Sequence, residues 1–283
     1  MLRLPKVTSE YYLSKTNNWL LRFYKSLLPK IEALEDTFSI IIQGPLNERS
    51  IKTIPEYIKY GKVIISCWDN DDTSLLDSYK NDIKIIINKY NDVLPYAKKT
   101  HLKNPIILQY YNTSNALKEC DTYFTIKLRS DESYPNLDAV IKKLRHNRDS
   151  HNTWFKVITS NIYFRFDKEK KFHPSDHIVA GSTSRMKCIF QHAFNKCKYN
   201  KIGKLGPEEI LGISSIETYF DTKLKKRNTA DRSKSAELMK KHFDIIRISD
   251  LPNRTWTSSY RKYDSLRSEE DWCHHINDID KFS

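Results

Sequence analysis

Short apolar runs that alternate with longer amphipathic stretches restrict the fold of this chain more than any other feature. Runs rich in Ile, Val and aromatic residues, typical of buried strands, cover 38–43, 63–68, 83–88, 123–128 and 154–160. Stretches with helical spacing separate them at about 49–60, 106–119 and 136–147. Strands that alternate with helices predict an α/β fold with a mainly parallel sheet flanked by helices.

The second half of the chain continues this pattern with more helix. It holds apolar runs at 177–181 and 243–248 and helical stretches near 183–198, 207–222 and 231–243. No internal repeat or low-complexity linker divides the chain. We therefore predict one α/β domain over 37–250, with helical additions at both ends: an N-terminal amphipathic helix within 1–36 and a C-terminal tail, 251–283, packed on the domain.

The N-terminal helix carries apolar residues at helical spacing from 9 to 34 and several basic residues, among them Lys15, Arg22 and Lys25. We expect it to dock on the core, and peripheral contact with an anionic membrane surface is the alternative. The basic segment 223–241 could serve the same contact. The first residues include no apolar stretch long enough for a signal peptide, and nowhere do 18 apolar residues run together.

Glycine and cysteine usage excludes several classes. The six glycines of the chain show neither G-x-G spacing nor a Walker loop, which argues against classical Rossmann dehydrogenases, P-loop NTPases and protein kinases. The five cysteines are odd in number and never spaced C-x-x-C, so neither a disulfide framework nor a zinc ribbon is expected. A reducing, cytoplasmic location fits this pattern.

The chain is strongly basic, because 48 Lys and Arg face 35 Asp and Glu and leave a net charge of +13. Expected partners are polyanions: nucleotide diphosphates, nucleic acid, or an anionic glycan or membrane surface. The alternative is that most of these lysines only form a solvated, solubilising surface.

Unusual polar groups follow three of the predicted strands. In open α/β sheets ligands bind at the carboxyl ends of the strands, so these residues are the first candidates for a site. They are Gln43-Gly44-Pro45 after the first run, Ser66-Cys67-Trp68-Asp69 at the end of the second, and Lys127-Leu128-Arg129-Ser130-Asp131-Glu132 at the end of the fourth. Adjacent acids suit a hard divalent cation, and Lys127 or Arg129 would help to neutralise a phosphate. Singly, an acid here is more often a helix cap, and Trp68 more often a core residue.

The three strand ends and two later motifs resemble the WavE-type lipopolysaccharide-synthesis family of glycosyltransferases. The matching segments are 38–45 (FSIIIQGP), 63–69 (VIISCWD), 126–131 (IKLRSD), 173–177 (HPSDH) and 207–209 (PEE). The resemblance covers about 38–222. Departures include Cys67 where Thr is usual and His177 where an aromatic residue would be expected.

The resemblance implies a GT-A-like fold in which a D-x-D-type acid pair holds Mn²⁺ or Mg²⁺ against the diphosphate of a nucleotide-sugar donor such as a UDP-sugar. Asp131 takes the last acid of that motif and Arg129 its first position, so Asp131 or Glu132 would hold the metal. The residues implied to bind the donor are Gln43, Gly44, Pro45, Ser66, Trp68, Asp69, Lys127, Arg129 and Ser130.

The implied reaction moves a sugar from the donor to a glycan or glycolipid acceptor in surface polysaccharide synthesis. Asp176 is the expected general base, with its carboxylate at a sheet edge open to an acceptor hydroxyl, and Glu208 and Glu209 would orient the acceptor. A turn or cap role is the competing interpretation of Asp176, and the helix macrodipole alone could explain Glu208 and Glu209.

Two other function classes remain open on the sequence. The positive charge and the strand-end acids would also suit a nucleic-acid-binding protein or a metal-dependent nuclease, although no recognised nucleic-acid-binding motif accompanies them. A catalytically inactive glycan-binding relative is the third class, because the first acid of the metal motif is absent. We expect no nucleic-acid partner.

Overall fold

The computed structural model describes residues 36–97, 105–150, 156–162, 164, 172–199, 205–220 and 232–256. Strands are β1 (Phe38–Gln43), β2 (Lys62–Trp68), β3 (Ile83–Asn88), β4 (Phe124–Arg129), β5 (Glu132–Ser133), β6 (Val157–Ser160), β7 (Ile178–Ser182), β8 (Phe243–Ile246) and β9 (Thr255–Trp256). Helices are α3 (Glu48–Ile58), α4 (Leu94–Ala97), α5 (Pro105–Lys118), α6 (Asp138–Asp149), α7 (Thr183–Lys198), α8 (Pro207–Phe220) and α9 (Arg232–His242), with short 3₁₀ turns at Thr73–Tyr79, Tyr90–Asp92 and Ile248–Asp250. The expected helix at 9–34, residues 223–231 of the basic segment and the tail from 257 lie outside the described residues, whereas residues 232–241 belong to α9.

Seven strands form the main sheet in the order β3-β2-β1-β4-β7-β6-β8. The pairs of β1 with β2 and β4, of β2 with β3, and of β6 with β8 are parallel, whereas β7 runs antiparallel to both of its neighbours, β4 and β6. The predicted mainly parallel sheet is therefore confirmed, with one reversed strand. Because β7 is reversed, the residues just before it lie at the same edge as the residues that follow β1, β2 and β4.

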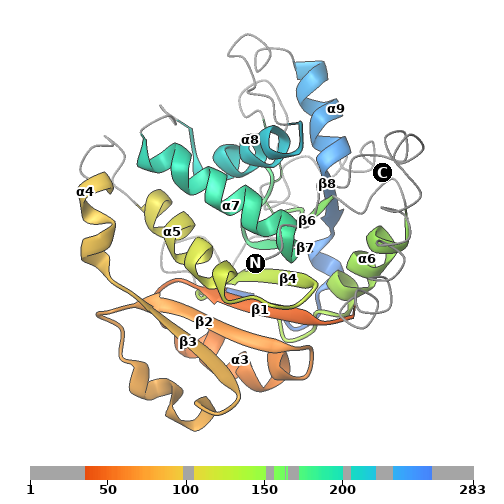
Figure 1. Ribbon diagram of the computed structural model, residues 1–283. Helices are drawn as coiled ribbons and strands as arrows, with labels where there is room; N and C mark the ends of the chain where they lie inside the picture. Colours follow the sequence, from red (N-terminus) through yellow and green to blue (C-terminus); the bar gives the residue numbers. More distant parts are fainter. Residues whose placement is uncertain are drawn as a thin grey trace, which may run out of the picture.

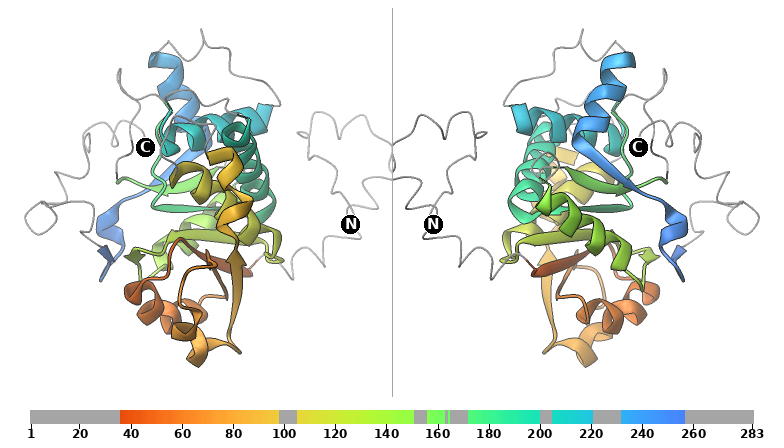
Figure 2. Two further views of the ribbon diagram at one scale, coloured as in Figure 1. Left: turned by 90° about the vertical axis from the view of Figure 1, so that its left-hand side faces the viewer. Right: turned by 90° about the vertical axis from the view of Figure 1, so that its right-hand side faces the viewer.

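Alternating side chains of the strands fill two separate apolar cores, one on each face of the sheet. In β1, Ile41 belongs to the core beneath α5, α7 and α8, and Ile40 and Ile42 belong to the core beneath α3 and α6. Figure 1 shows α5, α7 and α8 on one side of the strands and α3 on the other. In both side views of Figure 2, α3 lies at the bottom and α8 and α9 lie at the top.

Local sequence explains how α3 and α8 are placed. Helix α3 begins after Asn47, whose side-chain oxygen accepts a hydrogen bond of 3.0 Å from the backbone N–H of Arg49, a common N-cap. In α8, Gly212 permits close contact with the chain before β7, because a Cβ at this position would lie 2.0 Å from the carbonyl oxygen of Phe172. This contact packs the middle of α8 against the segment that precedes β7.

A two-stranded ribbon follows β4 at the same edge. β5 pairs antiparallel with β9, with Glu132 opposite Trp256 and Ser133 opposite Thr255. The first residues of the predicted C-terminal tail thus lie against the domain beside the candidate site. In the part of the chain that the structure describes, none of the helices combines the length and apolar character needed to cross a bilayer.

Candidate functional site

The ends of β1, β2 and β4 meet at one edge of the sheet. Gln43 is the register partner of Arg129, and the carbonyl oxygen of Gln43 accepts a hydrogen bond of 2.9 Å from the N–H of Ser130. The N–H of Gly44 donates to the carbonyl oxygen of Ser66 at 3.1 Å. These contacts join three segments that are far apart in the sequence.

Gly44 sits where no side chain fits. Its φ of +127° lies in a region that residues with a Cβ rarely adopt, and a Cβ would lie 2.5 Å from the hydroxyl oxygen of Ser130. Pro45, which follows, is exposed, whereas Ser130 is buried. The backbone turn after β1 therefore leads from a closely packed strand end directly to the surface.

Lys127 is fully buried in the middle of this edge. Its ammonium group donates a hydrogen bond of 2.7 Å to the main-chain oxygen of Asp176, which ties β4 to the chain before β7. Burial lowers the pKa of Lys127, while the neighbouring Asp176 acts in the opposite direction. Instead of facing an exposed phosphate site, Lys127 holds the loop before β7 in place.

Arg129 links the acids of the edge. Its guanidinium donates two hydrogen bonds to the carboxylate of Asp131, at 2.9 and 2.8 Å. Glu132 Oε1 lies 3.6 Å from Arg129 Nε, and Asp176 Oδ2 lies 3.8 Å from Arg129 Nη1. About a third of the Arg129 side chain remains exposed, 32%, so the guanidinium also reaches the surface.

Glu132 is buried and bonded within the protein. The hydroxyl of Tyr134 donates to its Oε2 at 2.7 Å, and Nδ1 of His177 contacts its Oε1. The backbone N–H of Tyr134 donates to the hydroxyl of Tyr57 at 2.9 Å, which anchors this group on α3. His177 follows Asp176 in the sequence, and the sequence left open whether it is a metal ligand or a hydrogen-bonded structural histidine; here it joins the chain before β7 to β5.

Asp176 lies at the predicted edge but is not open to solvent, since only 2% of the residue is exposed. Gln109 of α5 donates a hydrogen bond of 2.7 Å to its Oδ2, and its Oδ1 has no hydrogen-bond partner among the described residues. Burial alone would raise the pKa of Asp176, but the positive charges of Arg129 and Lys127 hold it well below its usual range. The expected direct access of an acceptor hydroxyl to this carboxylate is therefore absent from this conformation.

Glu208 and Glu209 occupy the first turn of α8, as the sequence predicts, but their surroundings differ. Glu209 accepts a hydrogen bond of 3.0 Å from the N–H of Gly206 and caps the helix start. Glu208 Oε2 lies 3.6 Å from Nε2 of His173. Burial, followed by the negative charge of Asp176, raises the pKa of Glu208 to about 7.

The aromatic group at the end of β2 packs inward. Trp68 is 5% exposed, stacks on Tyr111 of α5 at 6.4 Å between ring centroids and meets Tyr90 edge-on at 5.5 Å. Trp68 thus has the core environment that its alternative interpretation predicts. Asp69 beside it is exposed, and its Oδ1 accepts from the N–H of Tyr90 at 3.3 Å.

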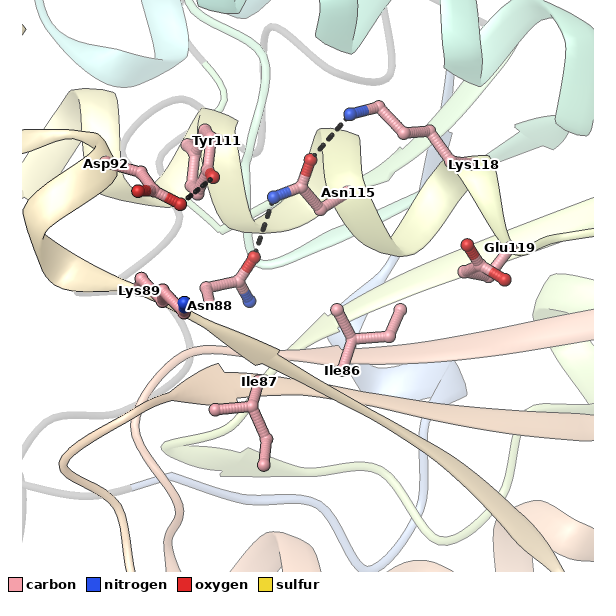
Figure 3. A pocket seen from close by; sticks show the side chains of 9 residues that line it. All are labelled: Ile86, Ile87, Asn88, Lys89, Asp92, Tyr111, Asn115, Lys118 and Glu119. Atoms are coloured by element: carbon pink, nitrogen blue, oxygen red, sulfur yellow. Dashed lines mark hydrogen bonds between the residues drawn. The ribbon is translucent and has the colours of Figure 1, made fainter.

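Ser66 contributes to a buried polar chain between β2 and α5. Its hydroxyl donates to the carbonyl oxygen of Asn112 at 3.0 Å and accepts from the amide of Asn88, also at 3.0 Å. Asn88 in turn accepts from Asn115, at the floor of a cavity of about 370 Å³ between β3 and α5 (Figure 3). Ser66 therefore holds the end of β2 in position through buried hydrogen bonds and does not line the surface.

The acids expected to hold a divalent cation are engaged with other groups of the protein. Arg129 binds both carboxylate oxygens of Asp131, and Tyr134 and His177 bind the two oxygens of Glu132. Within the described ranges, no three His, Cys, Asp or Glu residues are grouped so that they could hold a metal ion. The residues present at this edge do not fit a Mn²⁺ or Mg²⁺ site.

Comparison with known families decides the affiliation of the chain. The profile of the family described as WavE lipopolysaccharide synthesis matches residues 38–245, from the start of β1 to nearly the end of β8. The chain belongs to the WavE lipopolysaccharide synthesis family. No curated protein sequence matches the chain significantly.

Several solved structures are similar at low sequence identity. HddC from Yersinia pseudotuberculosis shares 12% identity over 53% of this chain and 79% of its own, with a TM-score of 0.34. An active-site mutant of LgtC shares 8% over 65% of this chain and 70% of its own, at 0.42. TarS of S. aureus, residues 1–349, shares 14% over 74% of this chain and 58% of its own, at 0.34.

Proposed function

We propose that this WavE-family protein transfers a sugar from a nucleoside-diphosphate-sugar donor to a glycan or glycolipid acceptor of the lipopolysaccharide type. One observation carries the proposal: a single network of charged groups at the carboxyl edge, where α/β sheets bind ligands. Three segments of the chain supply it: residues 129–132 through Arg129 and Glu132, the chain before β7 through Asp176, and the start of α8 through Glu208. Family membership adds the reaction class.

The donor would bind across the ends of β1 and β4. Gly44 leaves backbone at the turn without a side chain, and Gln43, Pro45 and Ser130 surround it. The exposed carboxylate of Asp69 is the group of this edge that would accept hydrogen bonds from ribose hydroxyls or the base. Arg129 would face the diphosphate, because a guanidinium matches phosphate oxygens in charge and in geometry.

Glu208 is our candidate for the group that takes the proton of the acceptor hydroxyl in an inverting transfer. A general base works best when its pKa lies near the working pH, and the pKa of Glu208 is raised to about 7. Asp176, whose pKa is depressed, is a weak proton acceptor, and its negative charge helps to raise the pKa of Glu208. Asp176 would thus act by tuning Glu208, while Glu209 caps α8.

With an acceptor of this class, we expect the reaction to take place at the cytoplasmic side of a membrane. Basic residues of the sequence segment 9–34, where a helix is expected, and of the segment 223–241 would provide peripheral contact with anionic lipid. Neutralising Lys225, Lys226 and Arg227 together should weaken sedimentation with anionic vesicles at low salt and leave donor affinity unchanged.

A melting-temperature screen tests the donor class directly, since a ligand of the native state raises the melting temperature. UDP-, GDP-, dTDP- and ADP-sugars would be compared with single-stranded and duplex oligonucleotides. The proposal expects one nucleotide-sugar class to raise the melting temperature and to do so less in Gly44→Ala. A shift with oligonucleotides and none with any nucleotide sugar would favour the nucleic-acid class instead.

A further inference from the structure

The first position of the expected metal motif holds a cation rather than an acid. Arg129 occupies this position, and its side chain covers both oxygens of Asp131. The next acid, Glu132, is buried under Tyr134 and His177. The side chains that would hold a metal ion are therefore already neutralised or bonded by groups of the same chain.

We propose that Arg129 is the cation that faces the donor diphosphate, and that Asp131 holds this arginine in position instead of holding a metal ion. The inference rests on the proposed function, because it concerns how the same donor is bound.

The guanidinium can serve both partners at once. Nε and one N–H of Nη2 point to Asp131, whereas Nη1 lies 3.8 Å from the nearest oxygen of Asp176, beyond hydrogen-bond length. A guanidinium has five N–H donors, so N–H groups that do not bind Asp131 remain available for two phosphate oxygens. Its partial exposure of 32% gives a ligand access to them.

The charge balance predicts which acid opposes the ligand. The carboxylates of Asp131, Glu132 and Asp176 surround Lys127 and Arg129, and each of these carboxylates opposes the approach of a diphosphate. Among these acids, the side chain of Asp131 is the most exposed, at 33% against 3% for each of the other two. Asp131 is therefore the carboxylate that competes with the diphosphate for Arg129.

The nucleotide affinity of Asp131→Asn distinguishes the two possible roles of Asp131. If Asp131 only holds Arg129, Asp131→Asn removes a competing charge and leaves nucleotide affinity equal or higher without a metal. If Asp131 is a metal ligand, the same variant loses metal-supported affinity. Arg129→Gln should weaken metal-free binding about 10–100-fold, the effect of losing hydrogen bonds to a charged group.

The experiment is calorimetric titration of the full chain with UDP, GDP, ADP and dTDP, in excess EDTA and in excess Mn²⁺. The wild type should bind one nucleotide with dissociation constants that agree within about threefold in the two buffers. The matched control is Arg145→Gln. It changes an exposed arginine of α6 that pairs with Asp36, and it should leave the dissociation constants in both buffers unchanged.

Binding that requires Mn²⁺ and is lost in Asp131→Asn would overturn the inference and leave the proposed function standing. Absence of binding for all four nucleotides in both buffers would overturn the proposed function and the inference together. If the melting curve shows that Arg129→Gln does not fold, nucleotide binding by the wild type and by Asp131→Asn, each measured in EDTA and in Mn²⁺, still tests the inference.

Discussion

The ammonium group of Lys127 and the main-chain oxygen of Asp176 are joined by a hydrogen bond of 2.7 Å inside the protein. This bond crosses from β4 to the chain before β7, so it fixes the position of the Asp176 carboxylate relative to Arg129 and Glu208. Loss of Lys127 would leave the buried carboxylate of Asp176 without the positive charge that, together with Arg129, holds its pKa low.

Lys127→Met should therefore destabilise the fold strongly. Removing one partner of a buried charged group costs about 3–5 kcal/mol, because the remaining charges stay buried. The matched control is Lys62→Met, which breaks an exposed pair with Asp121 and should cost about 1 kcal/mol or less. Urea unfolding of the two variants measures both values, and equal losses would show that Lys127 is not a central cation of the edge.

Gly44→Ala should destabilise the protein by about 1–3 kcal/mol and weaken donor binding. The alanine would have to adopt a φ near +127° and would push against the hydroxyl of Ser130. Gly181→Ala is the control, since a Cβ there meets its nearest atoms at 3.7 Å, an ordinary contact. Similar melting temperatures for Gly44→Ala and the wild type would contradict the role given to this turn.

The rate of transfer should rise with pH through about 7, because Glu208 accepts a proton only when ionised. Glu208→Gln should lower kcat by about 10²–10⁴-fold and keep donor affinity. The control Glu56→Gln removes an exposed acid on α3 and should keep full activity. A pH–rate profile that is unchanged in Glu208→Gln would exclude Glu208 as the base.

The same carboxyl makes stability depend on pH. Its pKa is about 7 when folded and about 4.3 when unfolded, so the folded state binds more protons between these values and stability falls as pH rises through this window. In Glu208→Gln, stability should no longer fall with pH through the ionisation of this carboxyl. Melting temperatures measured from pH 4 to pH 8 compare the two proteins, and identical slopes would contradict the raised pKa.

Asp176→Asn should move the midpoint of the pH–rate profile to lower pH. The negative charge of Asp176 raises the pKa of Glu208, so its removal lowers this pKa. If Asp176 were itself the base, the variant would instead lose about 10²–10⁴-fold in kcat with no movement of the midpoint. The position of the midpoint, measured on folded variant protein, separates tuning from direct catalysis.

Much of the fold could be predicted from the sequence because buried strands leave a local trace. The runs at 38–43 and 83–88 coincide with β1 and β3, and the stretch at 183–198 coincides with α7. The reversed direction of β7 had no such trace, since it depends on the path of the chain between β6 and β7. A strand's apolar pattern is the same in both directions.

The site could be predicted only where chain topology places residues together. Parallel strands bring Gln43, Ser66 and Arg129 to one edge, and this placement follows from their positions at strand ends. The bonds of Gln109 to Asp176 and of Glu132 to His177 join residues 67 and 45 positions apart, and no local pattern indicates them. The raised pKa of Glu208 depends on burial, which appears only after α8 has packed.

Transfer itself is the most direct test of the central claim. The wild type and Glu208→Gln would be incubated with a nucleotide-sugar panel and a truncated lipopolysaccharide acceptor, and the acceptor mass and released nucleotide would be measured. We predict that the acceptor gains one sugar mass with equal release of nucleoside diphosphate, and that Glu208→Gln loses about 10²–10⁴-fold of this rate. No mass gain with any donor, or the same rate in both proteins, would contradict the account.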